Sequence, residues 1–484
     1  MVKPSIIKNT SKSSAIIPPE LMQFVNHSTY SLLIKGYAGT GKTTLSLTIL
    51  KALNIKSNFF YVSTRISPRQ IFIYYPWLSK FIVGSRAPNS IENEYSLSSF
   101  EDARLDEPES LFERITNQLM DVKSPIIIID SWDAIASFMD KEARLNNERV
   151  LQTWGERAGA KLIFISGDPA DTTLDFLVDG IVELKQIFYD NTRIREMILS
   201  KLRGVRINKA SYIYTLNNSI FRSCAPFQPT RFIINADSKI LKKRQQKLSP
   251  LFNGKYITTG YIKLDTELRG GFPKGSIVLV ETDTNVNKLI VMSFIAKMMY
   301  KFAATSNPIL FGPGGIFDPA MVITCLKSYL QAKPKNVLVK IIWPINNMQH
   351  PFSEYIIPNQ KGSIKRRFEF FQHAVFKVKE ENPNRLLLNI IGKDADQKED
   401  LFDKTDQVRE TLPFLRDNVD LTLFVSGYKE NILSNLHNIC DFHMRLRIIN
   451  GSLFLQLSGM DSPLYEVISN NSSGYPRIKL EPIV

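Results

Sequence analysis

The chain has 484 residues, too many for a single hydrophobic core and enough for two. Hydrophobic residues make up 44% of it and charged residues 22%, which excludes disordered and fibrous proteins. The formal net charge of +14 favours polyanionic ligands or partners, such as nucleotide phosphates, nucleic acid, an acidic protein or an anionic membrane surface. A basic surface that is simply solvated would explain the charge equally well.

Cysteine and histidine are sparse. The three cysteines form no CxxC pair and the five histidines form no HExxH pattern, so neither a disulfide framework nor a zinc site is indicated. The N-terminal sequence lacks the apolar segment of a signal peptide, and no stretch reaches the roughly 18–20 apolar residues that span a bilayer. We therefore expect a cytoplasmic protein without a membrane span.

Short apolar runs alternate with amphipathic helical stretches from about residue 30 to residue 167, which is typical of a parallel α/β sheet. Buried strands are predicted at 31–36, 59–64, 125–130 and 161–166. Beyond residue 180 the pattern changes to period two in GIVELK, RIREMILSKLRG and SYIYTL. This change predicts antiparallel strands that complete the sheet.

The polar, basic stretch at 233–250 is interpreted as a linker or an exposed connecting helix. After it a similar succession begins again, because SIVLVE, NPILFG and LTLFVSGYKEN take the places of SLLIKG, NFFYVS and LIFISGDPADT. The simplest organisation is two copies of one fold, at 1–232 and 251–484, with the second copy much diverged. Two unrelated α/β domains are the alternative.

A glycine-rich loop follows the first predicted strand. Residues 36–43 read GYAGTGKT and match GxxxxGK[ST] between a strand and a helix, the context that separates this motif from a chance match. Glycines let the backbone amides curl around phosphate oxygens, and the helix adds the positive end of its dipole. Lys42 would bridge the β- and γ-phosphates, and the Thr43 hydroxyl would ligate Mg²⁺. The predicted ligand is ATP with Mg²⁺, and the predicted binding residues are Gly36, Tyr37, Ala38, Gly39, Thr40, Gly41, Lys42, Thr43 and Thr44.

Asp130 is the second predicted site residue. Four isoleucines lead into it, so its carboxylate should lie at the carboxyl edge of a buried strand, where ligands of open α/β sheets bind. We expect it to hold Mg²⁺ through water; the alternative is a strand-end aspartate that caps a turn. Ser131 and Asp133 are weaker candidates.

With these motifs the chain resembles the RecA-type P-loop ATPases and, within them, the KaiC-like branch. The first half carries GYAGTGKTT, IIIIDSWDAI, TLDFLVDGIVEL and KLRGVR, and the second half opens with TTGYIKLDTELRGGFPKGSIVLVE. STRISPRQI and the following PWL are more closely similar to the archaeal gas-vesicle regulatory protein D group. The resemblance covers about 30–220 well and 251–290 clearly, whereas 310–484 follows only in pattern.

The resemblance implies two tandem RecA-like P-loop domains. Each would have a mainly parallel sheet, helices on both faces and an antiparallel β-ribbon, and the second would be degenerate. It also implies a homo-oligomeric ring or filament in which Lys201 and Arg203 reach the nucleotide of a neighbouring subunit. A basic strand that faces solvent is the alternative for these two residues.

The chain departs from the family after the second strand. Active members place one or two glutamates there to orient the attacking water, whereas this chain has Arg65 and Ile66. Loss of such a base costs about 10²–10⁴ in rate, so ATP binding with slow hydrolysis is predicted. Asp168, after the fourth strand, is an alternative base.

The corresponding loop in the second half lacks the binding residues. When it is aligned on Lys288, the magnesium-binding hydroxyl becomes Leu289 and the three glycines become Thr282, Asn285 and Asn287. Asp283 would repel phosphate, and the apolar run at 386–392 ends in no carboxylate. The GPGG at 312–315 has no Lys-Thr after it. Nucleotide binding is therefore not expected in this half.

Three functional classes remain. The first is a regulatory switch that acts on a protein partner, with the second domain as a pseudo-ATPase. The second is a nucleic-acid-dependent motor or recombinase. This hypothesis rests on the positive net charge and on a basic cluster, Lys361, Lys365, Arg366 and Arg367. The same cluster also fits a solvated loop. The third is a structural adaptor with a vestigial site, against which the complete motif argues.

Overall fold

The computed structural model describes residues 16–83, 99–104, 106–121, 124–189, 192–229, 250–312, 317–330, 338–343, 351–358, 364–392, 405–427, 439–458, 462–470 and 477–484. The chain divides into two compact units, Met1–Ala225 with Ile483–Val484, and Pro226–Pro482. The linker predicted at 233–250 lies, apart from Pro250, outside the described residues.

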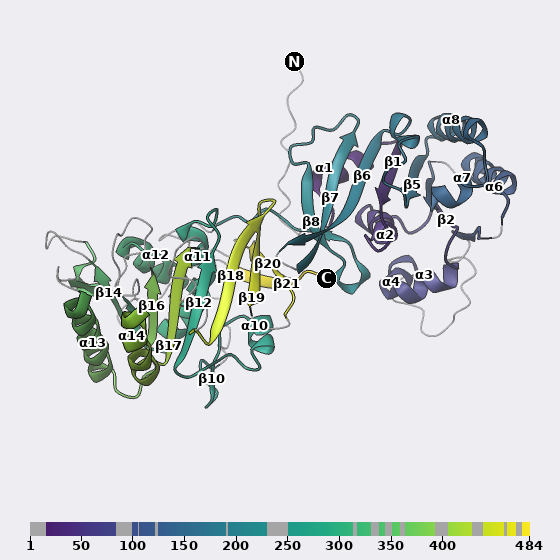
Figure 1. Cartoon of the computed structure of the whole chain (residues 1–484). Helices are drawn as coiled ribbons and strands as arrows, with labels where there is room; N and C mark the ends of the chain where they lie inside the picture. Colours follow the sequence, from purple (N-terminus) through teal and green to yellow (C-terminus); the bar gives the residue numbers. More distant parts are fainter. Residues whose placement is uncertain are drawn as a thin grey trace, which may run out of the picture. The chain divides into compact units, whose positions relative to one another are not determined.

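The first unit is built on one mixed sheet with the order β3-β2-β4-β5-β1-β6-β7-β8-β9 (Figure 1). Six strands pair in parallel: β1 Tyr30–Gly36, β2 Phe59–Ser63, β3 Phe100–Asp102, β4 Ile126–Asp130, β5 Lys161–Ser166 and β6 Gly180–Tyr189. Three antiparallel strands complete the sheet: β7 Thr192–Leu202, β8 Ser211–Thr215 and β9 Arg222–Ser223.

Helices cover both faces of this sheet. Alternate residues of β1 enter different cores: Leu32 and Ile34 pack with α2, whereas Leu33 packs with Trp132 of α7. The helices are α1 Pro19–Val25, α2 Lys42–Ala52, α3 Pro68–Tyr74, α4 Pro76–Val83, α6 Pro108–Asp121, α7 Trp132–Ala136 and α8 Lys141–Ala158, with short 3₁₀ turns η1 Leu174–Phe176 and η2 Asn217–Ser219.

The second unit has the sheet order β15-β14-β13-β16-β17-β12-β18-β19-β20-β21. Its strands are β12 Ser276–Thr282, β13 Ile309–Phe311, β14 Val339–Trp343, β15 Ile356–Pro358, β16 Leu388–Gly392, β17 Leu421–Gly427, β18 Phe442–Ile449, β19 Ser452–Ser458, β20 Tyr465–Asn470 and β21 Arg477–Pro482, beside a small pair, β10 Tyr256–Ile257 and β11 Phe272–Pro273. Its helices are α10 Ile262–Glu267, α11 Lys288–Ala304, α12 Pro319–Leu330, α13 Ile364–Glu381 and α14 Thr405–Asn418, with the 3₁₀ turn η3 Ser353–Tyr355.

The two sheets follow one plan. In each unit the strand before the aligned loop, β1 or β12, lies between a parallel strand that precedes the antiparallel ribbon and another parallel strand, β5 or β17. The remaining strands follow in the same order, except that the second unit has an extra edge strand, β15. The predicted α/β class, with two mostly parallel sheets that each end in antiparallel strands, is therefore confirmed.

The basic cluster predicted as part of a loop is helical where it is described. Lys365, Arg366 and Arg367 lie in the first turn of α13, and Lys361 lies outside the described residues. The loop interpretation of these three residues was wrong, because the apolar spacing of the residues that follow extends the helix back to Ile364. Among the described helices, none is long and apolar enough to cross a membrane.

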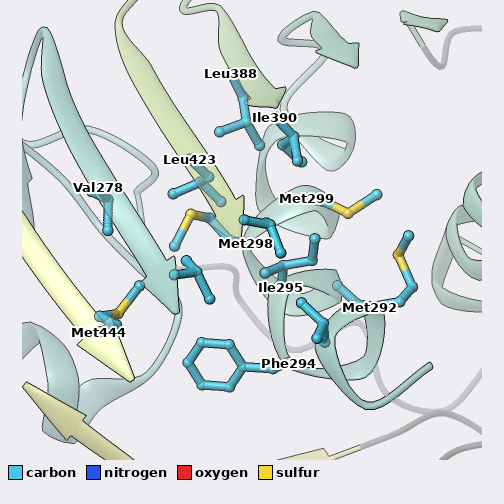
Figure 2. Packing of buried hydrophobic residues seen from close by; sticks show 14 of the residues in the cluster. Val278, Met292, Phe294, Ile295, Met298, Met299, Leu388, Ile390, Leu423 and Met444 are labelled. Atoms are coloured by element: carbon cyan, nitrogen blue, oxygen red, sulfur yellow. The ribbon is translucent and has the colours of Figure 1, made fainter. Parts of the chain in front are cut away.

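The core of the second unit is centred on α11. This helix is apolar around most of its circumference, and it packs against the sheet and against α12. Figure 2 shows methionines of α11, among them Met298, near Leu423 of β17 and Leu388 of β16. Burial of most of this helix explains why its sequence is largely apolar, with weak amphipathic periodicity.

Leu423→Ala should lower the free energy of unfolding of the second unit by about 2–5 kcal/mol, because it leaves a cavity in this core. Leu423 is 0% exposed, whereas Ile262 on α10 is 83% exposed. Ile262→Ala should therefore change stability by less than about 0.5 kcal/mol. Urea unfolding of both variants measures the difference, and equal effects would contradict this description of the core.

Candidate nucleotide-binding site

The glycine-rich loop, residues 37–41, joins β1 to α2 at the carboxyl edge of the first sheet. Gly39 and Gly41 have φ angles of 77° and 92°, a left-handed conformation that glycine adopts without strain. A Cβ atom on Gly36 would lie 2.4 Å from the Leu184 carbonyl oxygen, and one on Gly41 would lie 2.7 Å from Leu216 Cδ1. The loop therefore has its curled form only because these positions lack side chains.

The first turn of α2 has free backbone amides. Gly41 is the N-cap residue and offers no side-chain oxygen to them. Within the described part of the chain, the amides of Lys42, Thr43 and Thr44 donate to no protein acceptor. Uncapped amides at a helix start, with the positive end of the helix dipole, form an anion-binding site. This arrangement fits a phosphate group.

Lys42 lies over the same loop. Its Nζ donates to the carbonyl oxygens of Gly36 at 2.6 Å and Tyr37 at 3.0 Å. Burial lowers the pKa of Lys42, and nearby Arg65 lowers it further, whereas the Asp130 and Asp133 carboxylates raise it. The ammonium group is therefore partly desolvated, and it interacts with the charged side chains of Arg65, Asp130 and Asp133.

Thr43 and Asp130 meet although 87 residues separate them. Thr43 Oγ1 donates to Asp130 Oδ2 at 2.5 Å, because the start of α2 and the end of β4 lie at the same edge of the sheet. Tyr61 of β2 also donates to this oxygen, at 2.6 Å. Burial and the Asp130 charge hold the pKa of Tyr61 well above its ordinary value, so its hydroxyl stays a donor.

Two tyrosines that the sequence analysis did not name also hold the loop region. Tyr214 of β8 donates to the Thr40 carbonyl oxygen, and Tyr75 lies 3.1 Å from Thr44 Oγ1 through its hydroxyl. No motif marks these residues, since each reaches the loop from a distant segment. The one available signal was the alternation of SYIYT, which places alternate residues of a strand on the same face.

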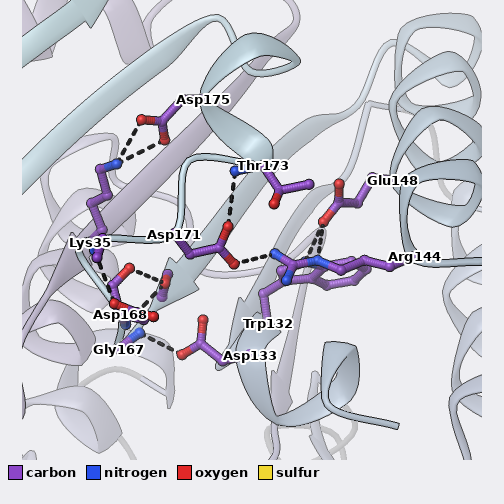
Figure 3. A network of polar contacts seen from close by, with 12 residues as sticks. Lys35, Trp132, Asp133, Arg144, Glu148, Gly167, Asp168, Asp171, Thr173 and Asp175 are labelled. Atoms are coloured by element: carbon purple, nitrogen blue, oxygen red, sulfur yellow. Dashed lines mark hydrogen bonds and ion pairs between the residues drawn. The ribbon is translucent and has the colours of Figure 1, made fainter. Parts of the chain in front are cut away.

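Arg65 and Asp133 lie beside this site (Figure 3 shows Asp133 and its contact). Asp133 Oδ2 accepts from the Gly167 amide and lies 3.8 Å from Arg65 Nη2. Ser131 donates its backbone amide to Thr64 Oγ1 at 2.8 Å. Asp168, the alternative base, accepts from the Ala170 amide at 2.9 Å and so caps its own turn.

Lys201 and Arg203 lie toward the opposite edge of the sheet. The next residue after Lys201, Leu202, pairs with Gly180, which in turn pairs with Leu32 near the start of β1. Lys201 Nζ donates to the Asp175 carbonyl oxygen at 3.0 Å, and Arg203 Nη1 contacts Asp179 Oδ1 at 2.6 Å. The structure does not bring these side chains to the loop of their own chain, so a role at a neighbouring subunit stays a prediction.

The second unit has a loop of the same length, residues 283–287, with different chemistry. Asn287 caps α11, because its side chain accepts from the Ile290 amide at 3.0 Å. The Asp283 carboxylate pairs with Arg445 Nη2 at 2.9 Å. A capped helix start beside a carboxylate does not favour phosphate binding.

The sheet, the curled glycine loop and the free helix start define a P-loop domain, a class whose chemistry implies nucleotide binding. Residues 21–202 match the family model described as GvpD gas vesicle protein, P-loop domain. The first unit therefore carries a P-loop domain of the GvpD family.

Two proteins of Halobacterium salinarum are distant homologues of the chain. Protein GvpD1 is 27% identical over 289 residues, which cover 56% of this chain and 52% of that protein. Protein GvpD2 is 24% identical over 331 residues, which cover 65% of each. The matched part of the chain thus spans between half and two thirds of the length of these relatives.

Gly41→Ala should destabilise the protein more than the same substitution at another glycine with a similar positive φ angle. Gly254 provides the control, because its φ of 93° matches the 92° of Gly41 while its added Cβ would meet nothing within 4 Å. At Gly41 the added atom would lie 2.7 and 2.8 Å from the two methyl carbons of Leu216 and 3.3 Å from its Cγ, so the leucine side chain must shift to make room.

Gly254→Ala should lower the free energy of unfolding by about 1–2 kcal/mol through backbone strain alone. Gly41→Ala should cost at least about 1 kcal/mol more through overpacking and should abolish nucleotide binding. Urea unfolding and calorimetric nucleotide titration measure the two effects. Normal binding by Gly41→Ala would show that the loop does not need this close approach.

Proposed function

We propose that the chain binds ATP with Mg²⁺ at the glycine loop of the first unit and is a slow ATPase that works as a nucleotide-dependent regulatory switch. The observation that carries this proposal is the first turn of α2, whose backbone amides are free, with Lys42 above it and the hydrogen-bonded Thr43–Asp130 pair beside it. The description of the matching family as a gas vesicle protein supports a role connected with gas vesicles.

The residues of the glycine loop and the side chains beside it each have a defined task in this proposal. The amides of Lys42, Thr43 and Thr44 and the Lys42 ammonium would hold the phosphates. The Thr43 hydroxyl and the Asp130 carboxylate are hard oxygen donors of the kind that Mg²⁺ accepts, and the bound ion would neutralise phosphate charge. Tyr61 keeps the carboxylate oriented through its hydrogen bond.

Slow hydrolysis follows from the groups beside the loop. Arg65 follows β2 and, as a guanidinium, takes no proton from water. The neighbouring carboxylates already have partners, since Asp133 accepts from the Gly167 amide and Asp168 accepts from the Ala170 amide. Ile66 packs against the core and contributes no polar group.

The switch needs a partner that reads the nucleotide state. In the proposal this is a regulatory protein or further copies of the chain in a ring or filament, where Lys201 and Arg203 would reach a neighbour's nucleotide. Arg203 is exposed enough for such a contact, with 64% of its side chain accessible. A nucleic-acid motor remains the alternative, and no contact among the described residues favours it over the switch.

Lys42→Ala should remove the thermal stabilisation that MgATP gives the wild-type protein. At a free concentration about 100 times Kd, bound ligand stabilises by about 2.7 kcal/mol, which corresponds to an increase in Tm of about 5–10 °C. Lys288 begins α11 as Lys42 begins α2, so Lys288→Ala is the matched control and should keep the full increase. An equal increase for Lys42→Ala would disprove binding at this loop.

Turnover by the wild-type protein should be about 10⁻³–10⁻¹ per second, two to four orders of magnitude below an ordinary enzyme. Phosphate release by purified protein measures it, with Lys42→Ala as the background. Hydrolysis at several molecules per second would rule out the switch. Single-stranded and duplex DNA should cause no stimulation at low salt, and a clear stimulation would favour the nucleic-acid motor.

A further inference from the structure

The backbone around Arg65 is held firmly against the site. The Thr64 amide donates to the Asp130 carbonyl oxygen at 2.8 Å, and Ser63 Oγ donates to the Ile66 carbonyl oxygen at 2.5 Å. Ser67 then caps α3 by accepting from the Gln70 amide. The point from which the Arg65 side chain extends is therefore fixed next to the end of β4.

The Arg65 side chain itself is only loosely held. It is 55% exposed, and its guanidinium lies 3.8 Å from Asp133, beyond hydrogen-bonding distance. Ion pairs of this exposure and length contribute little to stability. The carboxylate oxygen that faces Arg65 already accepts from the Gly167 amide. The backbone of Arg65 is therefore fixed, whereas its long side chain is held only by a weak contact with Asp133.

Arg65 and Lys42 lie at the same edge of the sheet, because their chain neighbours Thr64 and Thr43 both donate to Asp130, at 2.8 Å and 2.5 Å. The Lys42 ammonium, the Arg65 guanidinium and the Asp130 and Asp133 carboxylates interact electrostatically at this edge. A second cation that repels the loop lysine is unfavourable in the absence of an anion. A phosphate between the two cations would turn that repulsion into attraction.

We propose that Arg65 recognises the terminal phosphate of the triphosphate within its own chain. A triphosphate draws the guanidinium from Asp133, and a diphosphate leaves it there. The planar guanidinium fork matches two phosphate oxygens, which an ammonium group cannot do. Asp133 stays held by Gly167 in both states, so the exchange changes the charge balance at the start of α7. This inference rests on the proposed binding of ATP at the loop.

The test is calorimetric titration of the full chain with Mg²⁺ and either ADP or the non-hydrolysable β,γ-imido analogue of ATP. Arg65→Ala should weaken binding of the analogue by at least about tenfold, the effect of losing a charged hydrogen bond, and should change ADP binding by less than about twofold. Arg65→Lys should give an intermediate loss. Arg69→Ala, at an exposed arginine of α3, is the matched control and should change neither affinity.

A second variant tests the exchange of partners. Asp133→Asn keeps an oxygen for the Gly167 amide but removes the charge that attracts Arg65, so the analogue should bind about two- to fivefold tighter while ADP does not. This gain should vanish in the Arg65→Ala background. A gain that persists there contradicts the exchange.

The outcomes separate the inference from the function on which it rests. If wild type binds both nucleotides and Arg65→Ala weakens both equally, or neither, recognition by Arg65 is wrong and ATP binding stands. If wild type binds neither nucleotide, the proposed function is wrong and the inference is wrong with it. Melting temperatures of the variants without nucleotide show whether each one is folded.

Discussion

The close approach of the glycine loop to its neighbours is the constraint on which the site depends. Gly36 lies against the Leu184 carbonyl of β6, and Gly41 lies against Leu216 after β8. A side chain at Gly36 would overlap the Leu184 carbonyl, and one at Gly41 would force Leu216 to shift. The free amides at the start of α2 are therefore positioned by the antiparallel ribbon as well as by β1, and the Tyr214 hydrogen bond to Thr40 joins the ribbon to the loop.

The second unit has Thr282 and Asn287 at the positions of Gly36 and Gly41, so this close approach is absent there. It keeps the strand order and the loop length of the first unit, yet Asn287 caps its own helix and Asp283 is paired with Arg445 of β18. The amides and space that a phosphate would use in the first unit are taken by protein groups in the second. Arg445 of β18 pairs with the Asp283 carboxylate, and the Leu446 carbonyl oxygen accepts from the Asp283 amide, so protein groups hold this loop.

The sequence predicted what is encoded locally. Apolar runs and the GxxxxGKT spacing specify β1, β4, the loop and α2, and a run of isoleucines places Asp130 at a strand end, where the structure brings it to Thr43. The contacts of Tyr61, Tyr75 and Tyr214 were not predictable, because each joins segments far apart in sequence through one side chain. The basic start of α13 was assigned to a loop since charge alone does not distinguish an exposed helix turn from a loop.

Replacing a carboxylate by an arginine beside the loop changes what binding energy can do. A base that orients water acts mainly in the transition state and raises the rate, whereas a cation that holds the terminal phosphate equally in the ground state raises affinity alone. On the proposed function, Lys42 and Arg65 would thus favour a long-lived triphosphate complex. A regulatory switch needs such a complex, because its partner must find the bound state before hydrolysis ends it.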